Sequence, residues 1–389
     1  MNVFLRAAIA LAATSLSLQA IAADAPVPAA SAASAPLPAA RCEAPTADRA
    51  ANHACAVGLA RHADAERAAG RNDSALAALV RADQFSPEDL RFAMAHAALQ
   101  LKLANQLTPA GIEAAAKAAP DDIGLAMTHA ELSIAKKDFA GALADVDRVI
   151  AKRPDAPLAW EMRGTANVAR PDFPAARADV DQALRLDPKA PVTLRLRGIL
   201  RDNTGDYAGA LADYEAAHAL APRPDDPFVI GSTQFLQHQF GAAAATLATR
   251  TPPAPDGTYW RLWRYMAIAR LTGMARANGS LGPGGGAPWP GPVVDFFHGT
   301  IDAATLLDAA KKSQEAQDLS QVCEATFYMG EDALLRQHGD FIGLFRQAVK
   351  ECPINFHEYE GAVAELRAAG EPLTAAAPAA PAPAAPAAR

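Results

Sequence analysis

The chain of 389 residues has few aromatic side chains and none of three common enzyme motifs. Aromatic residues make up only 6% of it, and its hydrophobic content of 51% is rich in alanine. This composition predicts closely packed helices and no large aromatic core. The sequence contains no HExxH zinc motif, no GxSxG nucleophile elbow and no glycine-rich phosphate loop ending in Lys-Ser or Lys-Thr. We therefore expect a protein that is not an enzyme and binds no metal or cofactor.

The sequence also lacks any block of basic residues. Its 36 Lys and Arg residues are outnumbered by 43 Asp and Glu residues, which gives a net charge of −7. Nucleic acids and anionic lipid surfaces bind basic patches, so neither is an expected partner. The longest apolar run, at residues 7–18, is too short to span a bilayer, and we expect no membrane span.

That apolar run belongs to a predicted signal peptide at residues 1–22. Arg6 supplies the positive charge before the run, and the small-x-small triplet at 20–22 is typical of a cleavage site. A lipoprotein signal would need a cysteine directly after its cleavage box, and the first cysteine is Cys42. We therefore expect a soluble exported protein, located in a bacterial periplasm.

Cysteine is rare, with four residues that fall into two pairs. Cys42 lies near Cys55, and Cys323 opens a predicted helix whose hairpin partner ends at Cys352. Helices of similar length, about 20 Å, would bring the second pair together. An oxidising compartment favours two disulfides. A metal site is the alternative, but neither pair has CxxC spacing.

The segment 157–224 contains two copies of one 34-residue unit, joined without a gap. A bulky residue stands at the fourth place of each copy, Trp160 and then Leu194. The aligned pairs at the other key places are Gly164 with Gly198, Phe173 with Tyr207, Ala176 with Ala210, and Pro188 with Pro222. The small residues allow two antiparallel helices to approach closely, and the prolines end the second helix. This spacing of bulky, small, aromatic, small and proline residues is the tetratricopeptide pattern.

The repeat extends along much of the chain. Terminal prolines at positions 87, 120, 154, 188 and 222 recur at steps of 33, 34, 34 and 34 residues. We therefore predict an all-α fold, a tetratricopeptide solenoid of helical hairpins that coils into a right-handed superhelix. The predicted organisation is a signal peptide at 1–22, a disordered Ala/Pro linker at 23–46, the repeat array at 47–256, a C-terminal helical region at 257–369, and a disordered tail at 370–389.

Stacked hairpins predict a concave groove lined by the first helix of each unit. The expected lining residues are Met127, Glu131, Glu161, Thr165, Arg195, Ile199, Asp202, Phe228 and Phe235. This mixture of apolar and charged residues suits a protein or peptide partner. The sequence does not decide whether the partner is an extended peptide, a helix or a folded surface. Glu161 and Arg195 are alternatively explained as an ion pair between neighbouring repeats. We expect Asp179, Asp181 and Asp213 to lie on solvated helix faces.

The C-terminal region resembles that of NlpI-type periplasmic tetratricopeptide proteins. The matching residues are Phe327-Tyr328, Leu335, Gly339-Asp340, Phe345, Ala348-Val349, Asn355-Phe356, Glu365-Leu366 and Gly370. The resemblance implies an all-helical adaptor that holds envelope proteases or cell-wall hydrolases and performs no chemistry itself. A last helix at 356–369 is expected to cap the array, with Glu358 and Glu360 facing water.

The sequence therefore favours a protein-binding adaptor of the cell envelope. Two alternatives remain: a hydrolase that uses carboxylates near segment 260–297, and a structural subunit of an export machine. A homo-oligomer is also compatible with the sequence.

Overall fold

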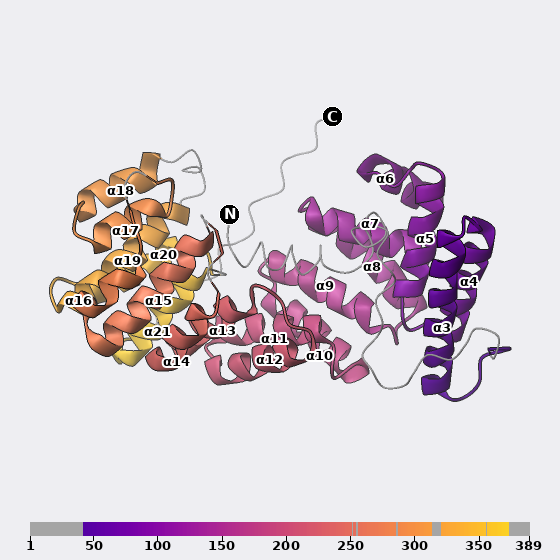
Figure 1. Ribbon diagram of the computed structural model, residues 1–389, viewed down its shortest axis with the longest axis horizontal. Helices are drawn as coiled ribbons and strands as arrows, with labels where there is room; N and C mark the ends of the chain where they lie inside the picture. Colours follow the sequence, from indigo (N-terminus) through magenta and orange to yellow (C-terminus); the bar gives the residue numbers. More distant parts are fainter. Residues whose placement is uncertain are drawn as a thin grey trace. The chain divides into compact units, whose positions relative to one another are not determined.

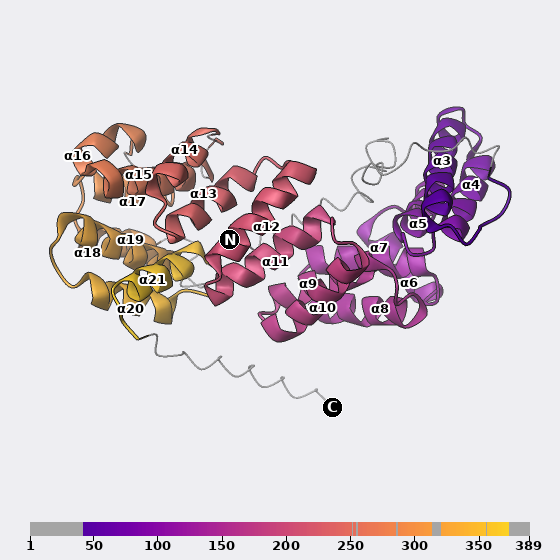
Figure 2. The ribbon, with the colours of Figure 1, turned by 90° about the horizontal axis from the view of Figure 1, so that it is seen from below.

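The computed structural model describes residues 42–250, 252–253, 256–284, 287–312, 320–354 and 356–372. All regular secondary structure in this part of the chain is helical (Figures 1 and 2). The helices are α3 (Arg49–Ala68), α4 (Asn72–Phe85), α5 (Arg91–Leu103), α6 (Pro109–Ala118), α7 (Ile123–Ala135), α8 (Phe139–Lys152), α9 (Pro157–Ala169), α10 (Phe173–Leu186), α11 (Pro191–Thr204), α12 (Tyr207–Leu220), α13 (Asp226–Leu236), α14 (Phe240–Ala248), α15 (Asp256–Thr272), α16 (Met274–Ala277), η2 (Asn278–Ser280), α17 (Gly291–Phe297), α18 (Ala303–Lys312), α19 (Ser320–Arg336), α20 (Phe341–Glu351) and α21 (His357–Ala368). The predicted all-α fold of tetratricopeptide hairpins is confirmed.

Several turns inside the hairpins follow one sequence rule. An aspartate precedes the second helix, and its carboxylate accepts a hydrogen bond from a backbone N–H in the first helical turn, which caps the helix. This is seen at Asp138 in front of α8, Asp172 in front of α10 and Asp206 in front of α12. The residue before Asp206 is Gly205, whose φ of +79° is in the left-handed region that favours glycine.

The helices form two compact units. In the described chain, unit 1 comprises residues 42–200 with 216–221, and unit 2 comprises residues 201–215 with 222–372. The sequence predicts a change from regular repeats to irregular helices near residue 256. That predicted change concerns the sequence pattern and is not the division between the two compact units, so it stays a prediction. The signal peptide, nearly all of the linker and nearly all of the tail lie outside the described residues.

Small side chains allow the hairpins of unit 1 to pack closely, as predicted. Ala176 on α10 is fully buried, and a Cβ placed on Gly164 of α9 would lie 3.2 Å from Cγ2 of Val180. Gly198 is buried as well, and Ala210 is fully buried within unit 2. A larger residue at position 164 would therefore push α9 and α10 apart.

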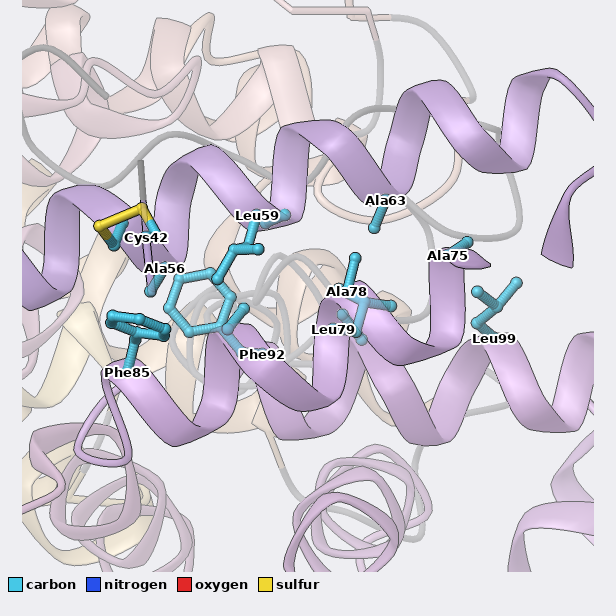
Figure 3. Close-up of a cluster of buried hydrophobic side chains, with 14 residues drawn as sticks. Cys42, Ala56, Leu59, Ala63, Ala75, Ala78, Leu79, Phe85, Phe92 and Leu99 are labelled. Carbon is cyan, nitrogen blue, oxygen red and sulfur yellow. A yellow bond between two sulfur atoms is a disulfide. The ribbon is translucent and has the colours of Figure 1, made fainter. Parts of the chain in front are cut away.

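The first hairpin of unit 1 has a core of its own, closed at one end by a disulfide. Leu59, Phe85 and Phe92 fill the space between α3, α4 and α5, beside the sulfur bridge (Figure 3). The bridge joins Cys42 to Cys55, and their Cα atoms lie 5.7 Å apart. This confirms the first predicted disulfide.

Aspartates on the second helices are buried beside polar partners from the same hairpin. Asp179 is 2% exposed and accepts hydrogen bonds from Arg163 Nη2 at 2.7 Å and Asn167 Nδ2 at 2.9 Å. Asp145, one repeat earlier in the pattern, contacts His129 in the same way. In unit 2, Asp213 accepts from Arg201 Nη1 at 2.7 Å. The expected solvated position is therefore wrong for Asp179 and Asp213, because each carboxylate neutralises a cation inside its hairpin, whereas Asp181 is exposed as expected.

Unit 2 has an aromatic core, contrary to the prediction from composition. Trp263 of α15 is fully buried, with its ring 5.3 Å from Phe235 and 5.9 Å from Phe327. Phe297 and Tyr328 extend this network. The overall scarcity of aromatic residues misled the prediction, because the few that exist are concentrated in unit 2.

The hairpin of α19 and α20 carries the second predicted disulfide. Cys323 and Cys352 are bonded, and their Cα atoms lie 4.9 Å apart. The chain then turns into α21, which packs against α20, α19 and α13. Glu358 and Glu360 of this helix are only 6% and 1% exposed, so the expectation that they face water is wrong. Helix α21 is a core element because it is covered by helices on several sides.

Candidate protein-binding surface

Six of the nine predicted groove residues lie in unit 1, on the first helices of successive hairpins. Met127 and Glu131 are on α7, Glu161 and Thr165 on α9, and Arg195 and Ile199 on α11. All are less than 9% exposed except Glu161, which is half-buried. The side chains therefore pack within the stack of hairpins, and Glu161 is the member of the set that a partner could reach directly. Their role in binding stays a prediction.

Glu161 is the centre of a polar cluster built from several elements of unit 1. Its carboxylate accepts a hydrogen bond from the hydroxyl of Thr193 on α11, and the charge of Arg91 on α5 acts on it. Burial raises the pKa of Glu161 to about 7, and the hydrogen bond from Thr193 and the charge of Arg91 oppose this rise. The carboxyl group therefore changes its charge near neutral pH, which is unusual for a glutamate.

Arg195 occupies the equivalent place one repeat after Glu161. Its guanidinium donates hydrogen bonds to the carbonyl oxygens of Ala221 and, at 3.5 Å, Pro191. Arg195 is 6% exposed. Its hydrogen bonds connect the residue after α12 to α11 within unit 1.

The other three predicted groove residues lie in unit 2, where the chain's own helices cover them. Phe228 of α13 packs 5.1 Å from the ring of His357 on α21 and 5.5 Å from Trp260 on α15. Phe235 packs against Trp263 and Phe240. These two residues therefore help to form the aromatic core of unit 2.

Asp202 completes the predicted set and faces another carboxyl group. Its Oδ2 atom accepts hydrogen bonds from the hydroxyls of Tyr214 at 2.9 Å and Thr233 at 3.2 Å. Burial and the nearby Glu360 of α21 raise its pKa well above the usual range. The pair is therefore expected to hold at least one proton at neutral pH, because two adjacent buried charges would repel each other.

Helix α21 brings further carboxyl groups into the interior of unit 2. Glu358 accepts a hydrogen bond from Tyr328 OH at 3.1 Å, and burial followed by the neighbouring Glu324 raises its pKa to about 8. Glu331 of α19 is fully buried, and burial followed by Glu365 raises its pKa to about 8 despite Arg270. Sequence reasoning missed this cluster because Glu358 and Glu360, in the first turn of a predicted capping helix, resemble a solvated face.

A buried carboxylate also lies beside the segment in which a hydrolase site was considered. Glu324 accepts hydrogen bonds from Trp289 Nε1 at 2.6 Å and from Tyr259 OH at 2.8 Å. Glu324 is 7% exposed, and these two hydrogen bonds connect the 287–290 loop and α15 to α19. The aromatic residues of α15, Trp260 and Trp263, are buried packing groups.

Two further findings concern metals and membranes. Within the described ranges, no group of three or more His, Cys, Asp or Glu residues is arranged to hold a metal ion. Among the helices that the structure describes, none has the length and hydropathy required to cross a bilayer.

No protein-family model matches the chain, and no curated protein matches its sequence. Solved structures with similar folds include a tetratricopeptide repeat protein from Parabacteroides merdae, which is 17% identical, with 58% of this chain and 90% of that chain covered and a TM-score of 0.37. A thermophilic tetratricopeptide protein of Thermus thermophilus is 19% identical, covering 55% and 98% of the two chains with a TM-score of 0.30. Yeast Tom70 is 14% identical, covering 83% and 55% with a TM-score of 0.28. The tetratricopeptide architecture rests on the helix pairs and their 34-residue spacing.

Proposed function

We propose that the chain is a non-catalytic adaptor that binds a protein partner in the periplasm of a bacterium. The observation that carries this proposal is the polar cluster around Glu161, to which three first helices of unit 1 contribute. Arg91, Glu161 and Thr193 come from α5, α9 and α11, which are separated in sequence by whole repeats. A surface assembled in this way recognises an extended or helical segment of a partner across several hairpins.

Export is supported by the two disulfides and the predicted signal peptide. Disulfides persist in oxidising compartments such as the periplasm, and both cysteine pairs of this chain are bonded. Cell-envelope proteases and cell-wall hydrolases are the partners implied by the resemblance of the C-terminal region to NlpI-type proteins. Fractionation of cells that express the chain with and without residues 1–22 tests the location, and cytoplasmic recovery of both forms would contradict it.

Site-specific crosslinking tests the adaptor surface. A photoreactive amino acid is introduced at Glu161, or at Arg177 as the control, because Arg177 is exposed on α10, a second helix of the same unit. We expect position 161 to capture a defined partner in living cells that position 177 does not capture. The same set of captured proteins at both positions, or none at position 161, would refute the proposed surface.

A charge reversal provides the second arm of the test. Glu161→Lys reverses the charge at the centre of the cluster and removes the acceptor of the Thr193 hydroxyl, and it should weaken partner capture by at least tenfold. Arg177→Glu is the matched charge reversal on α10 and should leave capture unchanged. The variant Arg195→Glu is unsuitable, because Arg195 is buried and its loss would disturb the hairpin.

A further inference from the structure

A hollow of about 390 Å³ opens on the surface of unit 2. It lies where the loop between α11 and α12, the end of α13 and the last turns of α21 come together. Its lining residues are Gly205, Tyr207, Leu236, Gln237, His238, Ala364, Arg367 and Ala368. The volume falls within the range of small-ligand sites, which is about 300–1,000 Å³.

Arg367 is the main charged group of this hollow. It is exposed, and it forms no ion pair with any carboxylate in the part of the chain that the structure describes. Its guanidinium lies 6.0 Å from the centroid of the Tyr207 ring. The ring therefore orients the cation without neutralising it.

The absence of a side chain at position 205 makes room for this arginine. A Cβ on Gly205 would lie 1.6 Å from Arg367 Nη1, and the positive φ of this residue also favours glycine. The turn between α11 and α12 thus fits closely around the guanidinium. Gln237 holds the turn in place, since its Nε2 atom donates a hydrogen bond to the carbonyl oxygen of Tyr207 at 3.1 Å.

The rest of the lining favours a ligand with one negative charge. Leu236, Ala364 and Ala368 supply apolar walls. His238 stacks on Phe240, and its Nε2 atom lies 3.6 Å from Glu365 Oε1. Arg367 supplies one positive charge to the hollow, and a carboxylate matches the planar fork of its guanidinium in bidentate geometry.

We infer that this hollow binds a carboxylate carried on a short apolar group, as found at a peptide C-terminus or on an acidic side chain. Arg367 binds the two carboxylate oxygens, His238 lies at the rim, and the apolar walls cover the adjoining carbon atoms. The site is distinct from the cluster around Glu161. If the hollow does not bind a carboxylate, the proposed adaptor surface around Glu161 is unaffected. If the adaptor surface captures no partner, the proposed carboxylate site is likewise unaffected.

Nuclear magnetic resonance with short peptides tests this site on the full chain. The probes are N-acetyl-Ala-Ala with a free carboxylate, the same dipeptide with an amide cap, and N-acetyl-Asp-amide, which carries its carboxylate on the side chain. We expect the free dipeptide or the aspartate probe to shift the signals of the Gly205 amide and the Arg367 Nε–H in a saturable manner. The amide-capped dipeptide should bind at least tenfold more weakly. A preference between the two carboxylate probes identifies which source the site takes.

Variants separate the site from general surface charge. Arg367→Met should reduce the affinity at least tenfold, and His238→Ala should reduce it by a smaller factor. Arg276→Met is the control, because Arg276 is an exposed arginine of unit 2 that does not line the hollow. Equal binding of the capped and free dipeptides would overturn the inference, as would unchanged affinity in Arg367→Met or no saturable shift with any probe.

Discussion

The hairpins of unit 1 pair their buried aspartates with polar side chains of the same hairpin, whereas unit 2 buries several carboxyl groups beside one another. Asp179 on α10 contacts Arg163 and Asn167 on α9, the other helix of the same hairpin. Glu360, in contrast, faces Asp202 from a helix far away in sequence. The first arrangement repeats with the 34-residue period, and the second joins Asp202, in the last regular copy of the repeat, to a helix beyond the repeats.

The two units also differ in how they fill their interiors. Unit 1 packs mainly alanine, glycine and aliphatic residues, with Phe85 and Phe92 near its first hairpin, while unit 2 surrounds Trp263 with other rings. Repetition explains the difference, since one spacing of small residues can be reused at every hairpin of a regular stack. Unit 2 closes helices of different lengths around one another, and large rings fill the resulting irregular spaces.

The largest expected effect is the loss of the central ring of unit 2. Trp263→Ala should lower the free energy of unfolding by about 3–5 kcal/mol, because it leaves a large cavity in a fully buried site. Unfolding in denaturant can be followed by tryptophan fluorescence in a Trp160→Phe background, in which the remaining tryptophans all belong to unit 2. Hydrogen exchange in peptides from residues 42–200 should not change, and acceleration there would contradict the assignment of this core to unit 2.

The two disulfides should differ in a graded way. In the chain-entropy model, a bridge that spans 29 residues stabilises by about 3.5 kcal/mol, and one that spans 13 residues by about 3 kcal/mol. Replacing Cys323 and Cys352 by serine should therefore destabilise unit 2 slightly more than replacing Cys42 and Cys55 destabilises unit 1. Hydrogen exchange resolves the two units, and an effect of either pair on the other unit would argue against this picture.

Breaking one buried pair in unit 1 should have an intermediate effect. Asp179→Ala leaves Arg163 and Asn167 without their shared acceptor and should cost about 2–3 kcal/mol, somewhat less than for a fully buried pair, because Arg163 is partly exposed. The double variant Arg163→Met plus Asp179→Leu should recover only part of this loss, because buried Asn167 still lacks its acceptor. Asp181→Ala, on the exposed face of α10, is the control and should change stability by less than about 0.5 kcal/mol.

A pH dependence of stability should have a sign that distinguishes unit 2. Glu331 and Glu358 have pKa values of about 8 in the folded chain, above the ordinary value of 4.5, so the folded state binds more protons between these values. The free energy of unfolding of unit 2 should therefore fall as the pH rises from about 4.5 to about 8 and then level off. The slope that one such carboxyl group can contribute is at most about 1.4 kcal/mol for a pH change of one.

The variant Glu358→Gln should flatten this dependence, since it removes one titrating group and keeps an acceptor for Tyr328. In unit 1 the opposite sign is expected at Glu66, because its hydrogen bond with Arg71 lowers the pKa to about 2. That contribution is present at neutral pH and is lost below about pH 4.5. Thermal melting by fluorescence between pH 5 and 9, in buffers of equal ionic strength, checks the first trend. A melting temperature of unit 2 that rises with pH would contradict it.

Local sequence rules predicted the hairpins and the bridges but could not predict the long-range packing. Gly164 and Ala176 specify close helix contact within one repeat, and their burial follows from their spacing. Asp145, Asp179 and Asp213 recur at 34-residue steps, and this recurrence was a signal for buried pairs. The pattern of apolar and polar residues along a single helix did not reveal it. The burial of Glu360 depends on α13 and α21 coming together, and no period in the sequence encodes that encounter.

The position of α21 has a consequence for the order of folding. Tyr207 and the carbonyl oxygen of Glu360 are 153 residues apart, whereas Arg163 and Asp179 are separated by 16. Contacts of unit 1 can form while the chain is still being made, but the interior of unit 2 closes only after synthesis has passed residue 360. Until then its aromatic side chains are open to solvent, so the newly made chain depends most on protection from aggregation during that interval.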